Sequence, residues 1–202
     1  MIHLHKNDLP SGLDFGPMVA MDTETMGLNP QRDRLCLVQL SDGKGDAHLV
    51  QFDKGHYTAP HLKQLLSDPN RLKIFHFARF DIAIIQHYLN LMVTPLFCTK
   101  IASRLCRTYT DSHGLKELCR ELLGVPISKQ QQSSDWGGGN LTKEQQEYAA
   151  SDVLHLHALR DKLTEMLVRE NRLELAQQCF SFLPARAILD LEGWPEIDVF
   201  AH

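Results

Sequence analysis

The sequence predicts an α/β domain in which a mixed β-sheet is flanked by α-helices. Strand-like apolar runs gather in the first part of the chain, and segments with apolar residues at helical spacing follow them. One later strand-like run lies between two helical segments, which is typical of a crossover connection. The 202 residues, of which 43% are hydrophobic, are enough to bury one core. We therefore expect a single domain over residues 1–202.

Three strands come first in this prediction. They are the apolar runs 18–24, 34–40 and 47–52, and the turn-rich stretch SDGKGD separates the second run from the third. Short connections between successive strands predict antiparallel hairpins. A fourth strand is expected over 71–77, and a short one is expected near the LFC stretch that ends at Cys98.

The helices are predicted from the spacing of their apolar residues. Helices are expected over 59–68, 79–90, 99–109 and 113–124, and a loop rich in Gly, Ser and Gln follows over 125–140. A long helix begins near Leu141, where Thr142 and Gln145 have the spacing of a capping box. The last helical region starts at Leu173, and we expect Pro184 to interrupt it.

Composition excludes several classes of protein. The formal net charge of −4 argues against tight passive binding of long nucleic acid, which needs many basic contacts to phosphates. The five cysteines show no C-x-x-C spacing, which argues against a disulfide framework or a zinc site. No secretory signal and no apolar stretch near 18 residues is found, so we expect a cytoplasmic protein with no membrane partner.

Two acids follow the first apolar run. Side chains alternate across a strand, so Asp22 and Glu24 are expected on the same side of it. One interpretation is a solvated strand end that leads into the turn GLNP. The other is a divalent cation bound between the two carboxylates, since oxygen ligands suit magnesium and manganese. The choice depends on acids elsewhere in the chain.

Further acids stand in two later segments. Asp81 lies in the first turn of a predicted helix, where the helix dipole favours an acid, but its apolar neighbours predict a burial that needs compensation. Tyr148 and Asp152 are four residues apart on another helix and therefore share a face. Each acid alone is weak evidence for a metal site.

Together these residues resemble the motifs of the DEDD family of metal-dependent 3′-to-5′ exonucleases, which have a ribonuclease H-like fold. Asp22 and Glu24 match the first motif, and Phe80-Asp81 with the upstream His76 resembles the second. The Y-x-x-x-D spacing of Tyr148 and Asp152 matches the variant of the third motif that carries tyrosine. The resemblance covers about residues 18–165, with a C-terminal helical region over about 166–202. Within the family the chain is similar to the ribonuclease D group, and most similar to its compact nanoRNase C branch.

The resemblance implies a mechanism that uses two divalent metal ions, Mg²⁺ or Mn²⁺. Asp22, Glu24, Asp81 and Asp152 would be the ligands, with Asp22 between both ions and Glu24 and Asp152 on the ion nearest the attacking water. Tyr148 would orient that water, because a phenol with a pKa near ~10 is a poor base at neutral pH. The expected products are 5′-mononucleotides.

Candidate substrate contacts complete the predicted site. The resemblance suggests Leu28 as an apolar wedge between two bases, although ordinary turn packing is an equal alternative. The basic residues on 99–109 could meet phosphate or form a solvated stripe, and Trp136 could be a stacking platform or a loop anchor. The candidate contacts are Thr23, Leu28, His76, Phe80, Lys100, Arg104, Arg107, His113, Lys116 and Trp136.

The expected function is hydrolysis of very short single-stranded RNA, dinucleotides such as pGpG, by an exoribonuclease. A general ribonuclease D-like exonuclease that acts on single-stranded RNA or DNA is the alternative within the same chemistry. A catalytically inert nucleotide-binding module is the alternative outside it, but such a module would have no chemical reason to keep four acids and a tyrosine. Apolar residues near Trp194 and Phe200 predict a contact between subunits of a homo-oligomer.

Overall fold

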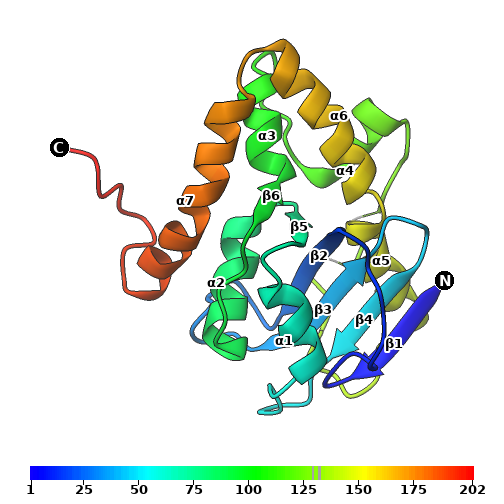
Figure 1. Ribbon diagram of the computed structural model, residues 1–202. Coiled ribbons are helices and arrows are strands. Elements are labelled where there is room, and N and C mark those ends of the chain that lie inside the picture. Colours follow the sequence, from blue (N-terminus) through cyan, green and yellow to red (C-terminus); the bar gives the residue numbers. More distant parts are fainter. Residues whose placement is uncertain (129, 132) are drawn as a thin grey trace.

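The computed structural model describes residues 1–128, 130–131 and 133–202; Lys129 and Gln132, which fall in the predicted loop 125–140, lie outside the described residues. These described parts of the chain form a mixed six-stranded sheet flanked by helices, as predicted (Figure 1). The strand order is β1-β4-β3-β2-β5-β6. The strands are β1 (Ile2–Lys6), β2 (Met18–Thr25), β3 (Leu35–Ser41), β4 (Ala47–Gln51), β5 (Leu72–Phe75) and β6 (Leu96–Cys98).

The predicted meander is confirmed, because β2, β3 and β4 are successive antiparallel neighbours. After β4 the chain crosses to the other side of β2, where β5 and then β6 add in parallel. Parallel addition places the ends of β2 and β5 at the same edge of the sheet. The residues that follow these two strands are therefore brought close together.

Among the strands of the described residues, the edge strand β1 is the one not predicted from the sequence. It pairs in parallel with β4, and Ile2 lies opposite Ala47. Five residues that include two histidines give little strand signal, and the partner strand lies far along the chain. Pairing of this kind depends on tertiary context more than on local preference.

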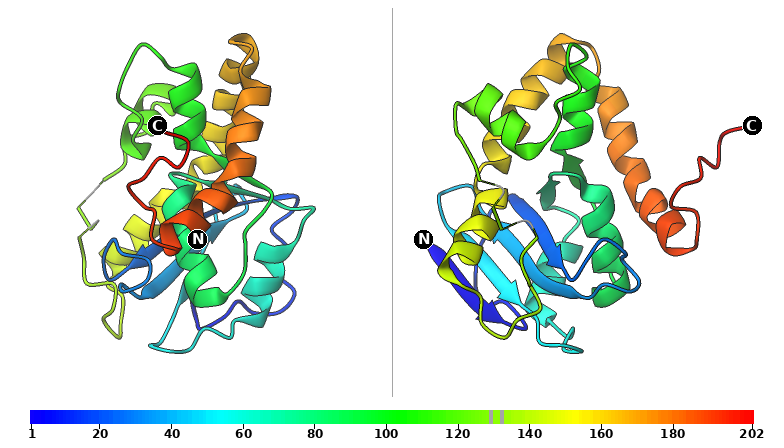
Figure 2. Two further views of the ribbon diagram at one scale, coloured as in Figure 1. Left: turned by 90° about the vertical axis from the view of Figure 1, so that its left-hand side faces the viewer. Right: turned by 180° about the vertical axis from the view of Figure 1, so that it is seen from behind.

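Helices cover both faces of the sheet (Figure 2). The helix α1 (Pro60–Ser67) connects β4 to β5, and α2 (Ala78–Leu89) connects β5 to β6. Figures 1 and 2 show α1 and α2 on one face and α5 on the other, where α5 packs across β2, β3 and β4. The remaining helices are α3 (Thr99–Cys106), α4 (Leu115–Leu118) with the π-helical turn η1 (Cys119–Leu123), α5 (Lys143–Leu154), α6 (Leu156–Arg169) and α7 (Leu173–Leu191).

The helix that carries the third motif starts as predicted. Thr142 is the N-cap of α5, and its hydroxyl accepts a hydrogen bond from the Gln145 amide while the Gln145 side chain accepts one from the Thr142 amide. The expected long helix is divided at His155 into α5 and α6. Asp152 therefore lies in the last turn of α5, close to the sheet, before the chain continues as α6.

The predicted interruption at Pro184 is wrong. The helix α7 continues through Pro184 to Leu191. Proline inside a helix costs about 3 kcal/mol, because it removes one backbone donor and crowds the preceding turn. The buried side chains Phe180, Leu183 and Ala187 lie on both sides of the proline and pack into the core. Burial of this apolar face offsets the cost.

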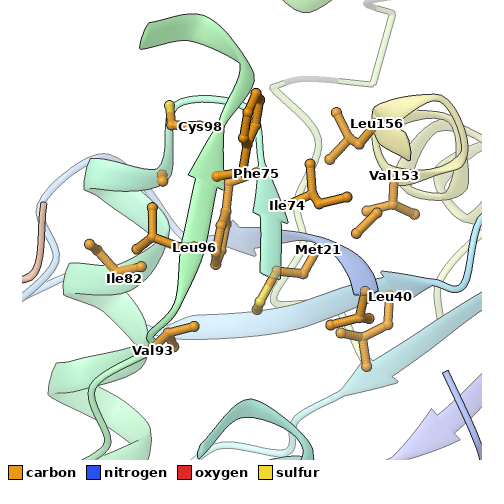
Figure 3. Packing of buried hydrophobic residues seen from close by; sticks show 14 of the residues in the cluster. Met21, Leu40, Ile74, Phe75, Ile82, Val93, Leu96, Cys98, Val153 and Leu156 are labelled. Atoms are coloured by element: carbon orange, nitrogen blue, oxygen red, sulfur yellow. The ribbon is translucent and has the colours of Figure 1, made fainter. Parts of the chain in front are cut away.

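The main core lies on both faces of the sheet (Figure 3). Every residue of β3 is buried, which requires cover on both sides. Figure 3 shows Ile82 of α2 beside Leu96 on one side, and Val153 and Leu156 near Ile74 on the other. The rigid centre formed by β2 and β5 carries the candidate site at its edge. No helix in the described ranges has the length and apolar character needed to cross a membrane.

Candidate active site

Three carboxylates converge at the end of β2. Asp22 and Glu24 are two residues apart on this strand and lie on the same side of it, as predicted. Asp152 approaches from α5, which covers that face of the sheet. One oxygen from each of the three carboxylates lies within 4.8 Å of the others.

The fourth acid, Asp81, reaches the same place from α2. It is buried, and its Oδ1 accepts a hydrogen bond of 2.6 Å from the hydroxyl of Thr23. Because Thr23 alternates with Asp22 and Glu24 along β2, its side chain faces the opposite side of the strand. Thr23 therefore holds Asp81 in place; it also lines the cavity above the acids, and the expected substrate contact stays a prediction.

Burial and mutual repulsion raise the pKa values of the clustered acids. Burial, and then the charges of Asp81, Asp152 and Glu24, raise the pKa of Asp22 well above its usual range. Burial and the charges of Asp152 and Asp81 raise the pKa of Glu24 to about 9. Burial raises the pKa of Asp81 to about 7, although the hydrogen bond from Thr23 opposes the shift. A positive charge among these groups would restore their ionisation at neutral pH.

The donor set fits a hard divalent cation. Carboxylate oxygens are the ligands that Mg²⁺ and Mn²⁺ prefer, and three of them already lie within 4.8 Å of one another. The repulsion between these carboxylates also indicates a cation site. Carboxylates that are buried side by side are stable in the ionised form only with a compensating charge. Asp22, Glu24 and Asp152 would hold the cation, and Asp81 lies beside them.

Tyr148 stands one helical turn before Asp152 and borders the same space. Burial, followed by the charges of Asp152, Glu24 and Asp22, raises the pKa of Tyr148 well above its usual range. The phenol therefore stays protonated at neutral pH and acts through its hydroxyl group as a hydrogen-bond partner. A role for Tyr148 in orienting the attacking water stays a prediction.

Trp136 lies beneath Tyr148, with a distance of 6.0 Å between the ring centroids. Its side chain is 2% exposed and packs in a small cluster with Cys36, Leu37 and Leu49. Of the two interpretations left open for Trp136, a loop anchor and a stacking platform, this burial favours the loop anchor.

The three glycines after Trp136 are fastened to the sheet. Arg34 donates to the carbonyl of Gly137 (3.0 Å), Gln51 to that of Gly138 (3.1 Å) and Lys6 to that of Gly139 (3.2 Å). Gly137 also lies close to the first-motif turn, because a Cβ there would lie 2.3 Å from Met26 Sδ and the Met26 side chain would have to move. The segment 137–139 is thus fixed against the first-motif turn and the edge of the sheet.

A cavity of about 620 Å³ opens above the acids. This volume is in the range of small-ligand sites, which are typically ~300–1,000 Å³. The predicted site residues that line it are Asp22, Thr23, Glu24, Leu28, His76, Phe80, Lys100, Lys116, Trp136, Tyr148 and Asp152. Leu28 is 87% exposed at its rim, which disfavours ordinary turn packing for this side chain.

The prediction for Arg107 is corrected. Its side chain is 0% exposed, and its guanidinium donates to Ser103, to the Ser112 carbonyl and to Glu121. Arg107 stabilises the chain after α3 and is not available to bind phosphate. The helix ends at Cys106, one residue before it, so Arg107 does not continue the basic helical face.

Arg104 and His113 are not among the residues that line the cavity. Arg104 is exposed on α3, and His113 Nδ1 forms a hydrogen bond of 2.8 Å with Ser103 Oγ. Lys100 and Lys116 are the two cavity-lining members of the predicted basic set. Positive charge at the cavity is therefore concentrated at these two lysines.

Phe77, which was not among the predicted site residues, lines the cavity with 44% of its surface exposed. Its residue type predicts a core position, and nothing in the strand pattern marks it as exposed. Ser128, Ser133 and Ser134 also line the cavity. Their place in a polar loop was the only available signal, and it does not separate a cavity wall from an ordinary loop.

Gly27 shapes the turn that presents Leu28. A Cβ at Gly27 would lie 2.3 Å from Asp33 Oδ2, and the same oxygen accepts hydrogen bonds from the Asn29 amide and from Arg32. Because Asp33 is tied to the turn by both contacts, it cannot move away freely. An added methyl group must displace the turn instead.

We therefore expect Gly27→Ala to lower kcat/KM by up to about 100-fold, the loss that a misplacement of ~1 Å can cause. Steady-state kinetics of wild type and variant on the same substrate measure this. Gly139→Ala is a control for loss of a loop glycine, because nothing lies within 4 Å of a Cβ there, Gly139 has no positive φ, and it does not line the cavity. Equal kcat/KM values for Gly27→Ala and wild type would contradict the assigned role of the turn.

Comparisons with known proteins agree with this geometry. A family model described as 3′-5′ exonuclease matches residues 7–168. The structure of Brucella melitensis NrnC bound to pGG is 55% identical, covers 100% of this chain and 98% of its own, and has a TM-score of 0.97. The structure of the same protein with bound Mg²⁺ is 54% identical, covers the same shares of both chains and has a TM-score of 0.96.

Curated sequences give the same family. Ribonuclease D of Gluconacetobacter diazotrophicus is 37% identical over 161 residues, which are 78% of this chain and 40% of that protein. The chain thus spans about two fifths of the length of the curated relatives that it matches.

Proposed function

Since the chain belongs to the 3′-5′ exonuclease family, we propose that it is an exoribonuclease that hydrolyses very short single-stranded RNA, dinucleotides above all, to 5′-mononucleotides. The observation that carries the proposal is the pairing of three convergent carboxylates with two lysines in one cavity of small-ligand size. The NrnC structure bound to pGG, at 55% identity over the full chain, supports the same substrate class.

Each group in the cavity has a role in this proposal. Asp22, Glu24 and Asp152, with Asp81 beside them, would hold divalent cations. When bound, these cations would supply positive charge to the scissile phosphate and lower the pKa of the attacking water. The Mg²⁺-bound NrnC structure supports this use of metal. Tyr148 keeps its proton and positions the water through a hydrogen bond.

The other end of the cavity would bind the rest of the substrate. A 5′-phosphorylated dinucleotide has two phosphates, and only one of them can occupy the carboxylate cluster. The second needs a cation, and Lys100 of α3 and Lys116 of α4 line the same cavity. Leu28, exposed at the rim, would separate the two bases.

A general exonuclease of the ribonuclease D type remains the second candidate. The identity of 37% with ribonuclease D supports it, but that similarity extends over only 40% of the relative. The formal net charge of −4 provides little attraction for a long RNA beyond the cavity. The two candidates differ in how the rate depends on substrate length.

We expect 5′-phosphorylated RNA dinucleotides to be cleaved faster than a 20-nucleotide RNA of matched sequence, and removal of the 5′-phosphate to raise KM. Time-resolved product analysis of labelled RNAs of two to twenty nucleotides, with a DNA series alongside, provides the measurement.

Leu28→Ala should lower kcat/KM on dinucleotides by about tenfold, which corresponds to a loss of ~1.4 kcal/mol of transition-state binding. Leu175→Ala, at an exposed leucine of α7 outside the cavity lining, serves as the control.

Equal rates on the dinucleotide and the 20-nucleotide RNA, with no effect of the 5′-phosphate, would reassign the chain to general RNA trimming. Absence of hydrolysis on every RNA in the presence of Mg²⁺ or Mn²⁺ would support the inert nucleotide-binding module instead.

A further inference from the structure

Phe77 adopts an unusual backbone conformation at the cavity. It is the residue before the first turn of α2, with φ 70° and ψ 44°, in the left-handed region. Residues with a Cβ rarely adopt this region, and bulky residues adopt it least, so the conformation costs free energy. A glycine would avoid the cost. The position nevertheless carries a large aromatic side chain.

That side chain does not compensate for the strain by burial. Phe77 is 44% exposed and lines the cavity, whereas its neighbours Phe75 and Ala78 are 0% exposed. An exposed phenyl ring on a strained backbone gains little from the hydrophobic effect. Backbone strain of this kind is found preferentially at sites that bind ligands.

The surrounding contacts hold Phe77 in place. The Thr99 hydroxyl donates to the Phe75 carbonyl (3.0 Å), so its oxygen accepts the hydrogen bond from His76 Nδ1 (2.9 Å). This arrangement joins the end of β5 to the start of α3. It fixes the backbone of the two residues that directly precede Phe77.

A cation lies against the ring. Lys100 Nζ is 4.1 Å from the centroid of Phe77, within the range of a cation–π contact. Both residues line the cavity. The ring therefore fixes the position of a positive charge inside the cavity, and the positive charge lies directly beside an exposed aromatic surface.

We propose that Phe77 and Lys100 form one recognition unit for the 5′ nucleotide, in which Phe77 stacks on the base and Lys100 binds the 5′-phosphate. The inference rests on the proposed function and adds Phe77 to its substrate-binding residues. A base and its own phosphate are adjacent in a nucleotide, and the ring and the ammonium are adjacent here. Aromatic stacking accepts any base, since every base has a π-face.

Two substitutions of Phe77 separate binding from packing. Phe77→Leu keeps an apolar side chain and removes the aromatic face, and Phe77→Gly also removes the backbone strain. We expect both to raise KM for pGpG by about 5- to 100-fold, the equivalent of one base–aromatic stack, with a smaller change in kcat. Phe77→Gly should melt at or above the temperature of Phe77→Leu, because glycine adopts the left-handed conformation without strain.

The link to the phosphate is tested with the substrate. In wild type, we expect a higher KM for GpG, which lacks the 5′-phosphate, than for pGpG. Lys100→Met should reduce the ratio of the KM for GpG to the KM for pGpG. Phe77→Leu should reduce the same ratio in part, because the ring no longer holds the ammonium. Phe77→Trp should retain the wild-type KM within about threefold, since indole also stacks on bases and attracts cations.

Two residues that do not line the cavity serve as controls, one for the aromatic ring beside a cation and one for the positive φ of Phe77. Tyr109 is an exposed aromatic residue with the Arg107 guanidinium 5.6 Å from its ring centroid, and Asn90 has φ 53° at the other end of α2. Tyr109→Leu and Asn90→Gly should leave KM for pGpG unchanged.

The proposal is overturned if wild type hydrolyses pGpG and both Phe77 variants keep its KM within twofold. It is also overturned if Phe77→Gly melts well below Phe77→Leu, since Phe77 would then be a packing residue. Failure of wild type to hydrolyse any short RNA is a different result, because it removes the proposed function itself.

Discussion

Replacing Asp22 by asparagine is expected to abolish hydrolysis and to raise the melting temperature of the metal-free protein. Asparagine keeps the shape of the side chain but removes the charge that would hold a cation. The loss of several kcal/mol of transition-state stabilisation corresponds to at least ~10³-fold in rate. The gain in stability has a separate cause, because Asp22 repels Asp81, Asp152 and Glu24.

The pH dependence of stability tests the same repulsion. Asp81 and Glu24 have pKa values of about 7 and about 9 in the folded protein, whereas unfolded carboxyl groups titrate near ~4. Between these values the folded state binds more protons than the unfolded state. The free energy of unfolding of the metal-free protein therefore falls as the pH rises from about 4 to about 9.

Thermal unfolding in EDTA at pH 5, 7 and 9 measures this slope in wild type and in Asp22→Asn. The variant should show a shallower fall, since each remaining acid has lost one like-charged neighbour. Asp14→Asn, at an exposed carboxylate in the loop before β2, is the matched control and should keep the wild-type slope and rate. Full activity of wild type in EDTA, or of Asp22→Asn in Mg²⁺, would refute the metal site.

The second large effect is expected for Tyr148→Phe. The substitution keeps the ring that packs on Trp136 and removes only the hydroxyl group. If the hydroxyl positions the attacking water, kcat should fall by about 10²-fold or more while KM changes little. Because the pKa of Tyr148 is raised well above its usual range, the pH–rate profile of wild type should show no ionisation of this phenol between pH 6 and 9.

Tyr57→Phe is the control for loss of a partly buried phenol. The Tyr57 hydroxyl donates to the Leu35 carbonyl (2.9 Å) and lies outside the cavity lining. We expect this variant to lose some stability and to retain kcat. An unchanged kcat for Tyr148→Phe would make Tyr148 a structural residue.

Sequence periodicity was sufficient to predict the elements that carry the acids. The strand that ends in Asp22 and Glu24, the start of α2 before Asp81 and the capping box of α5 all follow from local signals. Each signal involves residues within a few positions of one another. The acids were therefore placed on the right elements, and their convergence follows from the strand order.

The errors arose where tertiary contacts decide the structure. Arg107 has the spacing of a surface residue, but Glu121 and Ser112 surround its guanidinium. Pro184 stays helical because the residues on both sides of it are buried. The left-handed backbone of Phe77 has no sequence signal, because it depends on how β5, α2 and α3 meet. None of these features is encoded within a short window of sequence.

The order of the elements along the chain has a consequence for synthesis. Asp22, Glu24 and Asp81 are made early, but Asp152 and Tyr148 belong to α5, which packs across β2, β3 and β4 only after the intervening helices have been made. Domains generally fold as units during translation, and contacts distant in sequence form late. A growing chain on the ribosome therefore lacks the complete carboxylate cluster until α5 has emerged. Because α5 is made late, the messenger and ribosomal RNA beside the nascent protein are not exposed to a complete nuclease site before α5 has emerged.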